Sequence, residues 1–434
     1  MGLREYIEKI EKEGILRTVD AEVSKNLEIS GILKEMEPIP VLFNKIQESE
    51  YRVIGNLFCT KDAISSYFEV KPEDLIPMLS KAINTPSDPE VVSNAPCQEI
   101  IETAVDLDKI PILFHCERDG GNYISSAVVV TRDPDYGQNL DFHRAMQFSK
   151  DKFTTRIVRG RHFHKFLEKN DELEVAFCIG NTPNILIAGA TSVDIGFDEL
   201  TIANTLEPIK VTKANFVDLT IPAEAEFVLE GRVYLKETHP EGPFVDLTET
   251  YDVIREEPVF EVKKITHRKN AIWQALLPGA LEHKILMGMP REPTIFNKVN
   301  EAGVKCLDVN INPGGCSWLH AIVQIDKKTE EDGKKAIDGA FAGHGSCKHV
   351  FIVDKDINIY DPLSVEWAMA TRFQGDTRLY MKDKEPGSSL DPSAEPGTKM
   401  TTKIGFDLTK PLVAKGKDFS LAEFPKVDIN KYFK

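Results

Sequence analysis

The sequence predicts a multidomain protein of mixed α+β and α/β type, in which a β-rich segment lies between two segments that alternate helix and strand. Its 434 residues are too many for one hydrophobic core and suggest two or three domains. Short apolar runs separated by turn residues fill the middle of the chain, as expected for β-structure. Helical and strand periodicities alternate on either side of it.

The N-terminal segment, residues 1–95, is expected to form an α/β domain. The proline pair in Pro86-Ser87-Asp88-Pro89 breaks the pattern and indicates a boundary nearby. The expected elements are a helix on the face Leu3, Ile7 and Ile10 that ends at Gly14, strands at 41–43 and 52–54, and a helix that begins near Glu73.

Residues 96–290 are expected to be β-rich, and the spacing favours a barrel or sandwich over a βαβ array. The main helix allowed inside this segment runs from Asp198 to about Leu206, after a break at Gly196. The expected strands are 127–130, 175–179, 184–188, 227–235 and 259–262.

The βα alternation returns in residues 291–434. Residues 384–399 are rich in Pro, Gly and Ser and are expected to form a loop. The last twenty-five residues suit a tail that packs on another subunit or domain. The expected elements are strands at 304–311, 319–325 and 350–353 and helices at 329–341 and 362–372, the second with Pro near its start.

The bulk composition excludes several partners. A net charge of −16 spread along the chain repels nucleic acid and anionic lipid, so we expect neither as a partner. No apolar stretch reaches the length of a membrane helix and no signal-peptide segment is recognised, so we expect a cytoplasmic protein. The seven cysteines show no Cys-x-x-Cys spacing, and we expect buried reduced thiols.

Three polar residues are candidate metal ligands. Asn139 and Glu199 supply oxygen and His162 supplies nitrogen, a mixture that suits Mn²⁺ or Mg²⁺ better than structural zinc. Three protein ligands would leave positions for phosphate oxygens and water. Because these ligands are too far apart to form a motif, a surface histidine in a solvated loop is the simpler interpretation of the spacing alone.

A basic cluster precedes the candidate histidine. Arg156, Arg159 and Arg161 stand close together in an acidic protein and could hold a phosphate.

A second cluster combines Arg144 with Glu241 and Asp246. A buried arginine needs a carboxylate partner, and pairing with one acid leaves the other free to titrate. An acid among apolar groups such as Phe244 can donate a proton. Taken alone, the sequence fits a loop whose acids face water better than it fits a functional cluster.

Three further patterns carry weaker signals. The segment 343–348 resembles an anion-binding loop before a strand but lacks P-loop spacing. His162 and His164 on one strand face would suggest zinc only with a third ligand nearby. Glu226 and Glu230 alternate on one side of an expected strand, more typical of a solvated face than of a catalytic pair.

Several long segments resemble, in the right order, the UbiD family of decarboxylases, which use prenylated FMN. The resemblance covers nearly the whole chain and favours the functional interpretation of both clusters. The segments are Gly120 to Ile124, Asp133 to Asp135, Asn139 to Arg144, Pro222 to Gly231, Glu241 to Phe244, Ile265 to Arg268 and Asp361 to Arg372.

The resemblance implies an N-terminal α/β domain, a central split β-barrel that binds the flavin, and a C-terminal α/β domain used in dimer formation. The family's metal ligands fall on Asn139, His162 and Glu199, which would bridge Mn²⁺ to the flavin phosphate with K⁺ close by. A phosphate-contacting lysine falls on Lys348. The further cofactor-binding residues expected are Phe142, His143, Arg144, Arg156 and Arg161.

The resemblance also implies three catalytic roles. Arg144 would orient the substrate carboxylate and contact the flavin, Glu241 would hold Arg144, and Asp246 would protonate the product after CO₂ leaves. Val245 stands where the family more often has Gly, which puts the placement of Asp246 in question.

The substrate implied by the resemblance is anhydromevalonate phosphate in archaeal isoprenoid synthesis, whose phosphate could be bound by Arg159, Arg161 or Arg268. A 4-hydroxybenzoate-type aromatic acid, as in quinone synthesis, is the alternative substrate. A non-catalytic flavin-binding subunit is the alternative of another class. The expected partners are a flavin prenyltransferase as cofactor supplier and a second copy of the chain in a homodimer or higher homo-oligomer.

Overall fold

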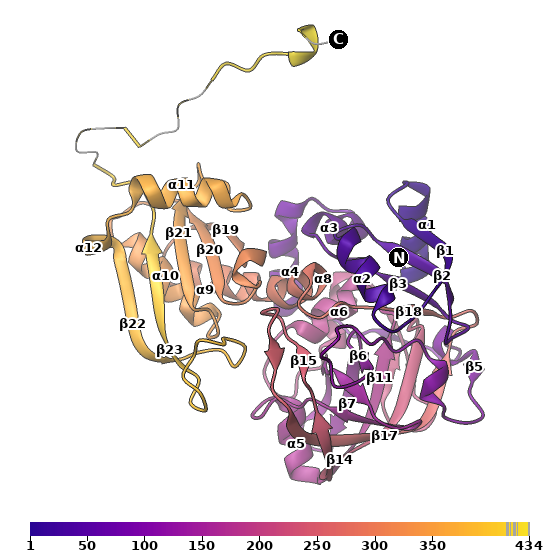
Figure 1. Cartoon of the computed structure of the whole chain (residues 1–434). Coiled ribbons are helices and arrows are strands. Elements are labelled where there is room, and N and C mark those ends of the chain that lie inside the picture. Colours follow the sequence, from indigo (N-terminus) through magenta and orange to yellow (C-terminus); the bar gives the residue numbers. More distant parts are fainter. Residues whose placement is uncertain (414–415, 417, 420–421, 423, 433–434) are drawn as a thin grey trace.

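The computed structural model describes residues 1–413, 416, 418–419, 422 and 424–432. It has two lobes (Figure 1): the N-terminal and central segments lie together, and residues from about 292 onward form the second lobe. This is a mixed α/β multidomain protein, as expected. The predicted tail falls partly outside the described residues; its described part extends away from the second lobe, with Phe424 90% exposed, and its packing on another subunit stays a prediction.

The N-terminal segment forms a small sheet covered by helices. The strand order is β1-β2-β3-β18, so the fourth strand comes from far along the chain, where Ile272–Gln274 pairs in parallel with β3. The elements are α1 (Leu3–Lys12), β1 (Arg17–Val23), α2 (Glu28–Met36), β2 (Val41–Ile46), β3 (Arg52–Gly55), α3 (Lys61–Phe68), η1 (Pro72–Asp74) and α4 (Leu75–Asn84). The helix on Leu3, Ile7 and Ile10 is present, and those three residues are buried.

The central segment forms a nine-stranded sheet of order β6-β9-β10-β17-β14-β11-β7-β8, with β5 paired to β17. In the described residues this path does not close into a barrel. The strands are β5 (Ile100–Ile101), β6 (Tyr123–Ile124), β7 (Val128–Asp133), β8 (Gly137–Phe142), β9 (Ala145–Gln147), β10 (Lys152–Thr155), β11 (Glu172–Ile179), β14 (Phe227–Glu241) and β17 (Arg255–His267).

Smaller elements surround this sheet. Two of them matter for the site: α5 begins at His162, and the hairpin β15–β16 lies beside Arg144. They are β4 (Glu90–Val91), η2 (Pro96–Gln98), η3 (Leu107–Lys109), α5 (His162–Asn170), α6 (Pro183–Ala190), α7 (Leu200–Leu206), β12 (Lys210–Lys213), β13 (Thr220–Pro222), β15 (Phe244–Val245), β16 (Tyr251–Asp252) and β18 (Ile272–Gln274).

Two local predictions in this segment were wrong. Residues 184–188 form part of α6 and not a strand; Pro183 begins the helix and every residue of it is buried, so no polar face distinguishes the two periodicities. His162 and His164 lie on α5 and not on a strand face.

The expectation of a solvated face at Glu226 and Glu230 was also wrong, because both side chains are fully buried. Glu226 binds the Arg4 guanidinium through two hydrogen bonds of 2.7 Å. Glu230 accepts hydrogen bonds from the backbone N–H groups of Phe216 and Val217. Each acid therefore ties the central sheet to another part of the chain.

The second lobe is a five-stranded sheet of order β19-β20-β21-β23-β22, in which β20, β21 and β23 are parallel. The expected loop at 384–399 begins later than predicted, because β22 continues to Pro386. Helix α8 (Leu281–Gly288) and η4 (Met289–Arg291) precede this lobe along the chain, and η6 (Ile429–Lys431) lies in the tail. The elements of the lobe are α9 (Glu292–Glu301), β19 (Cys306–Asn310), η5 (Pro313–Gly315), β20 (His320–Ile325), α10 (Asp332–Gly343), β21 (His349–Asp354), α11 (Pro362–Arg372), α12 (Gly375–Arg378), β22 (Leu379–Pro386) and β23 (Met400–Asp407).

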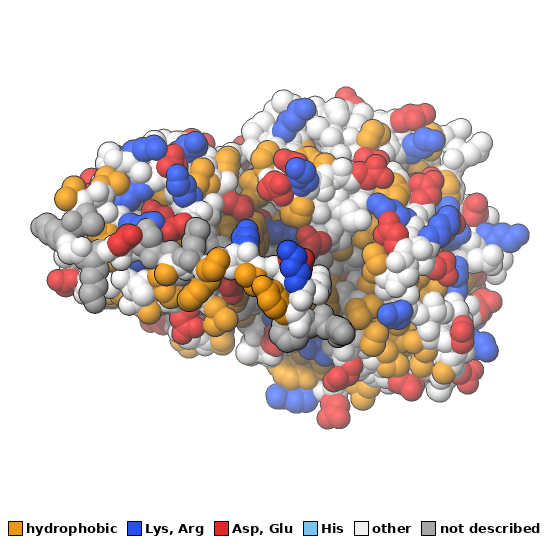
Figure 2. Space-filling view, turned by 90° about the horizontal axis from the view of Figure 1, so that it is seen from above, with side chains coloured by type: hydrophobic (Ala, Val, Ile, Leu, Met, Phe, Trp, Pro, Cys, Tyr) orange, Lys and Arg blue, Asp and Glu red, His pale blue; other side chains and the backbone are white. Residues whose placement is uncertain are grey.

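The surface mixes both signs of charge. Seen from above, Lys and Arg side chains are interspersed with Asp and Glu, and the molecule is hollowed where the lobes meet (Figure 2). None of the helices in the described ranges has the length and apolar character that crossing a bilayer requires. All seven cysteines are free, and Cys116 and Cys316 are the two that are not fully buried.

Candidate active site

A cavity of about 510 Å³ lies where the two lobes meet. Strand β8 and helices α5 and α6 line it from the central segment, and Trp318 and residues 387–390 line it from the second lobe. Its volume is in the range of small-molecule sites. The wall includes most of the predicted site residues, namely Asn139, Phe142, His143, Arg144, Arg156, Arg161, His162, Glu199 and Asp246.

The candidate metal ligands converge on this cavity from three elements. Asn139 lies on β8, His162 is the first residue of α5, and Glu199 directly precedes α7. The Nδ1 atom of His162 is 3.1 Å from the Asn139 Oδ1 atom. Glu199 accepts a hydrogen bond of 2.8 Å from the backbone N–H of Leu140, next to Asn139. Residues far apart in the sequence therefore meet at one end of the cavity.

The electrostatics of these residues fit a cation. Burial, together with the neighbouring charges of Asp141 and Asp198, raises the pKa of the Glu199 carboxyl well above its usual value. Burial and the charge of Lys165 lower the pKa of His162, which favours the neutral imidazole that ligates metals. A divalent ion would offset the cost of the buried carboxylate.

The candidate metal site depends on the amide oxygen of Asn139. Within the described ranges, no group of three or more His, Cys, Asp or Glu side chains is placed to hold a metal ion. Asn139 therefore has to complete the set. Its Oδ1 atom, the His162 ring and the Glu199 carboxylate form a mixed oxygen and nitrogen donor set suited to Mn²⁺ or Mg²⁺.

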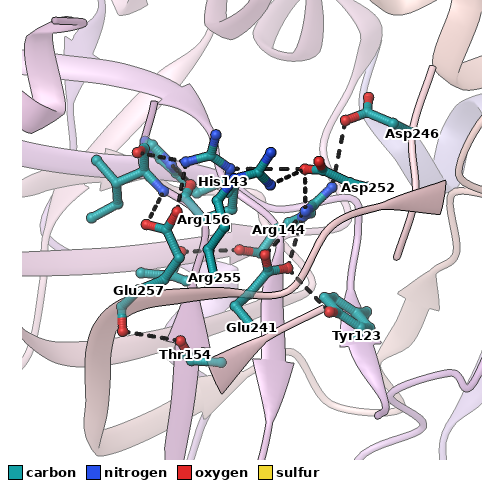
Figure 3. Close-up of polar contacts among 12 residues, drawn as sticks. Tyr123, His143, Arg144, Thr154, Arg156, Glu241, Asp246, Asp252, Arg255 and Glu257 are labelled. Atoms are coloured by element: carbon teal, nitrogen blue, oxygen red, sulfur yellow. Dashed lines mark hydrogen bonds and ion pairs between the residues drawn. The ribbon is translucent and has the colours of Figure 1, made fainter. Parts of the chain in front are cut away.

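Arg144 is the centre of a network of ion pairs (Figure 3). Its Nε and Nη2 atoms donate to the two carboxylate oxygens of Glu241 at 2.9 and 3.0 Å. Glu241 has no exposed surface and also accepts a hydrogen bond of 3.0 Å from the Tyr123 hydroxyl. These contacts fix the guanidinium plane, since a forked arginine–carboxylate pair has one preferred geometry.

Asp252 is a member of this network that sequence reasoning missed. Its Oδ2 atom accepts a hydrogen bond of 3.0 Å from Arg144 Nη2 and one of 2.6 Å from Arg255 Nη1. The hairpin register places Asp252 opposite Phe244. Pairing the two halves of the segment 244–252 as a hairpin would have shown that this acid lies beside the Glu241 segment.

Asp246 lies at the cavity with one carboxylate oxygen free of strong pairing. Its Oδ2 atom is 3.6 Å from Arg144 Nη1, while its Oδ1 atom accepts a hydrogen bond of 2.6 Å from the Leu247 backbone N–H. The backbone N–H of Asp246 donates to the Thr250 carbonyl at 2.9 Å. The turn between β15 and β16 thus holds the acid next to Arg144, with Val245 buried behind it.

His283 is a second residue that sequence reasoning missed. It lies on α8, lines the cavity, and its Nδ1 atom accepts a hydrogen bond of 3.0 Å from the Gly279 backbone N–H. Burial lowers the pKa of His283 to about 4, and the nearby Asp246 acts in the opposite direction. A neutral imidazole that accepts at Nδ1 carries its proton on Nε2. His283 is therefore a hydrogen-bond donor near the acid.

Two of the remaining basic candidates, Arg156 and His143, are held by polar contacts. Arg156 is paired with Glu257 at 2.6 Å, and its carbonyl lies 3.0 Å from His143 Nδ1. His143 Nε2 is 2.9 Å from Asp141. Burial lowers the pKa of His143, but Asp141 and the Arg156 carbonyl outweigh burial and raise it overall. His143 is thus held on both sides of its ring.

Two of the predicted basic residues lie apart from the cavity wall. Lys348 is 2.8 Å from Asp391 and is absent from the cavity lining. Arg268 pairs with Glu224 at 3.1 Å and is also absent from the lining. Arg159 lines the cavity and is exposed.

An arginine fixed by carboxylates, an acid beside it and a set of metal-type donors in one cavity define an enzyme that acts on a small acid. The chain is a carboxy-lyase and belongs to the UbiD family. It matches the family models for the 3-octaprenyl-4-hydroxybenzoate carboxy-lyase N-terminal domain at 7–83, Rift-related domain at 90–281 and C-terminal domain at 284–408.

Several curated relatives carry the same name. The chain is 41% identical to the anhydromevalonate phosphate decarboxylase of Methanocaldococcus jannaschii over 92% of this chain and 96% of that protein. It is also 41% identical to the anhydromevalonate phosphate decarboxylase of Methanosarcina mazei over 98% of this chain and 100% of that protein.

Solved structures of UbiD-class enzymes superpose closely. The enzyme HmfF from Pelotomaculum thermopropionicum in complex with FMN gives a TM-score of 0.96 at 33% identity, covering 100% of both chains. The apo 3,4-dihydroxybenzoic acid decarboxylase of Klebsiella pneumoniae gives a TM-score of 0.92 at 25% identity, also over 100% of both chains.

Proposed function

We propose that the chain is a prenylated-FMN-dependent decarboxylase whose substrate is trans-anhydromevalonate 5-phosphate, an α,β-unsaturated acid of isoprenoid synthesis. The geometric observation that supports decarboxylation is Arg144, fixed by Glu241 while its Nη1 atom faces Asp246 at the cavity. The choice of substrate is supported by relatives that are 41% identical over more than nine-tenths of this chain.

The flavin phosphate would be held through a metal ion on Asn139, His162 and Glu199, with K⁺ close by. The neutral imidazole and the buried carboxylate of this set favour a divalent cation. Phe142 and His143 would contact the cofactor along the same wall. A role for Lys348 would require it to exchange its contact with Asp391 for a phosphate.

Bound prenylated flavin would supply the electron sink for the loss of CO₂. The chain's own residues position the substrate and move a proton. Arg144 would bind the substrate carboxylate through Nη1, because its Nε and Nη2 atoms are already occupied by Glu241. Asp246 would then give its proton to the carbon that has lost CO₂, and His283 would orient the acid or the substrate from Nε2.

A 4-hydroxybenzoate-type aromatic acid is the second candidate substrate. Its support is the structural likeness to a 3,4-dihydroxybenzoic acid decarboxylase, at 25% identity, which is weaker than the likeness to the anhydromevalonate phosphate enzymes. A non-catalytic flavin-binding subunit is disfavoured because Arg144, Glu241 and Asp246 occupy one site.

Three further proposals concern the molecule's context. A flavin prenyltransferase would supply the cofactor. A homodimer or larger homo-oligomer is supported by the exposed apolar residues of the tail. The three segments 1–95, 96–290 and 291–434 would act as N-terminal, flavin-binding and C-terminal domains, and the open sheet of the second would be a split barrel.

The testing experiment is anaerobic purification after co-expression with a flavin prenyltransferase, followed by absorption spectroscopy, native mass analysis and CO₂ release. We expect bound prenylated flavin and release from anhydromevalonate phosphate. Release only from 4-hydroxybenzoate would replace the substrate. Absence of bound flavin, both with and without the co-expressed prenyltransferase, would refute the cofactor and the mechanism together.

A further inference from the structure

In the described part of the chain, Arg291 lines the cavity without an acidic partner, unlike two other arginines of the same wall. Arg144 is paired with Glu241 and Arg156 with Glu257. Among the ion pairs of the described residues, none involves Arg291. Arg291 closes η4, immediately before α9, and lines the cavity at the junction between the two lobes.

The contacts of this guanidinium leave donors unused. One Nη2–H donates to the Ala190 carbonyl at 3.3 Å, and the group lies 5.4 Å from the centre of the Trp318 ring. The Nε atom is buried and has no hydrogen-bond partner. A guanidinium has five N–H donors, and a buried one without acceptors is costly. The guanidinium therefore has donors available to an acceptor in the cavity.

The local field around Arg291 is positive. Burial, with the charge of Arg161 acting in the same direction, lowers the pKa of Arg291 to about 10. The neighbouring His344 reports the same field: burial and then the charge of Arg291 lower its pKa to about 3. Removing an unpaired charge from water is unfavourable. An anion in the cavity would offset that cost.

The same cavity offers further groups that bind phosphate. Ser346, Ser389 and Lys399 of the second lobe also line it. Arginine with serine hydroxyls and a lysine is the donor set that proteins use for phosphate monoesters.

Helix α8 separates this set from the proposed proton donor. His283 lies near its start, close to Asp246, and Arg291 follows its C-terminal end. Eight residues of helix span about 12 Å. An anion at Arg291 would therefore lie at the opposite end of the cavity wall from the Asp246 region, as the two charged ends of a short bifunctional acid require.

We propose that Arg291, assisted by Arg161, binds the phosphate monoester of the substrate while Arg144 binds its carboxylate. The proposal rests on the proposed function and adds the group that would select phosphorylated over unphosphorylated acids. The cofactor phosphate is the other possible source of this anion, and the experiment separates the two.

The experiment uses the flavin-loaded holoenzyme as wild type, Arg291→Met, Arg291→Lys and Arg17→Met. Arg17 is an exposed arginine of β1 and serves as the matched control. Flavin occupancy is measured by absorption, and affinity for 3-methylbut-3-enyl phosphate and for the corresponding alcohol by calorimetry. The probe carries the phosphate without the carboxylate, so its binding does not depend on turnover.

We expect Arg291→Met to weaken alkyl phosphate binding about 30- to 100-fold, as for the loss of one partner of a buried charge pair, with flavin occupancy unchanged. Arg291→Lys should retain part of the affinity, and Arg17→Met all of it. The alcohol should bind weakly to every variant. The KM for the phosphorylated acid should rise with kcat little affected.

Two results would overturn the proposal. Wild-type affinity for the alkyl phosphate in Arg291→Met would remove Arg291 from the subsite. Loss of flavin with unchanged affinity in the loaded fraction would assign Arg291 to the cofactor phosphate. By contrast, Arg291-dependent binding in an enzyme that does not decarboxylate anhydromevalonate phosphate would retain the phosphate subsite and refute the proposed substrate.

Discussion

At the scale of single residues, the site is organised around the unequal use of one guanidinium. Two nitrogen atoms of Arg144, Nε and Nη2, donate hydrogen bonds to Glu241, and Nη2 also donates to Asp252. The third, Nη1, faces Asp246 at 3.6 Å. Burial opposes the charged form of Arg144, but Glu241 and the two aspartates outweigh burial and raise its pKa. The cation is therefore permanent at any working pH.

Replacing Asp246 by Asn should remove the proton donor while leaving the cavity shape intact. We expect kcat to fall by about 10²- to 10⁴-fold, the usual contribution of a general acid, with flavin occupancy unchanged. CO₂ release and the flavin absorption spectrum provide the measurement. The matched variant His283→Asn should reduce activity less; the reverse order would transfer the proton-donor role to His283.

Replacing Asp252 by Asn should act through the position of Arg144. The Arg144 and Arg255 guanidinium groups would lose a shared carboxylate. We expect kcat/KM to fall about tenfold, mainly through KM, in keeping with the loss of a partly buried ion pair. Glu237→Gln, which removes an exposed partner of Lys152, is the control. Equal kinetics for the two variants would contradict a positioning role for Asp252.

At the scale of elements, the long antiparallel strand pair β14–β17 provides the framework that places Glu241 of the site. Its register shifts between Glu230 and Gly231, and a Cβ atom added at Gly231 would lie 2.0 Å from the Glu261 carbonyl oxygen. This bulge requires glycine because the backbones approach too closely for any side chain. Downstream of it, the same strand ends at Glu241.

Gly231→Ala should therefore destabilise the protein by several kcal/mol, since the obstacle is backbone and cannot rotate away. Chemical denaturation followed by circular dichroism would measure the effect. Gly137→Ala is the comparison at a turn glycine with positive φ and open space around it, and we expect about 1 kcal/mol there. A smaller effect at Gly231 than at Gly137 would contradict this account of the bulge.

The elements also show how far the sequence could predict the molecule. The strands expected at 175–179 and 227–235 lie inside β11 and β14, because short runs rich in β-branched and aromatic residues favour strands even where they are buried on both faces. Residues 184–188 were wrongly predicted to be a strand, since a helix buried on every side has no periodic signal. The burial of Glu226 and Glu230 was hidden because their partners, Arg4 and the 215–217 backbone, are remote or non-specific in sequence.

The candidate site divides in the same way. The clusters around Arg144 and Asn139 were predicted because long family-like segments contain them, and the structure brings both to one cavity. Asp252 and His283 were missed because their roles depend on a hairpin register and a helix position. Arg291 was missed because the absence of a partner cannot be read from a sequence.

At the scale of the whole molecule, the lobes are joined by buried charged groups as well as by apolar packing. Glu292 at the start of α9 pairs with Lys61 of α3 at 2.6 Å. Within the first lobe, Glu282 of α8 is buried and accepts a hydrogen bond of 3.1 Å from the Phe58 backbone N–H. Burial raises the pKa of Glu282 to about 8.

This raised pKa predicts a pH-dependent stability. The folded state keeps the Glu282 proton that the unfolded chain gives up near its ordinary pKa of about 4.3. The stabilising contribution is therefore complete below that value and is lost as the pH rises through about 8. One proton changes the free energy of unfolding by at most about 1.4 kcal/mol per pH unit.

Glu282→Gln should flatten this dependence between pH 5 and 8, measured as the free energy of unfolding by denaturant titration across that range. Glu366→Gln, an acid on α11 outside the cavity lining, serves as control and should leave the profile as in wild type. A parallel profile for Glu282→Gln and wild type would show that Glu282 is ionised in the folded protein.

The parallel pairing of β18 with β3 has a consequence for synthesis. The edge of β3, with Val53 and Ile54 fully buried in the finished protein, stays uncovered until residues 272–274 leave the ribosome. At about 5 to 20 residues per second, that interval lasts on the order of ten to forty seconds. The first lobe is thus closed by its own distant segment, and a nascent chain arrested before that point would expose an adhesive strand edge to chaperones or to its neighbours.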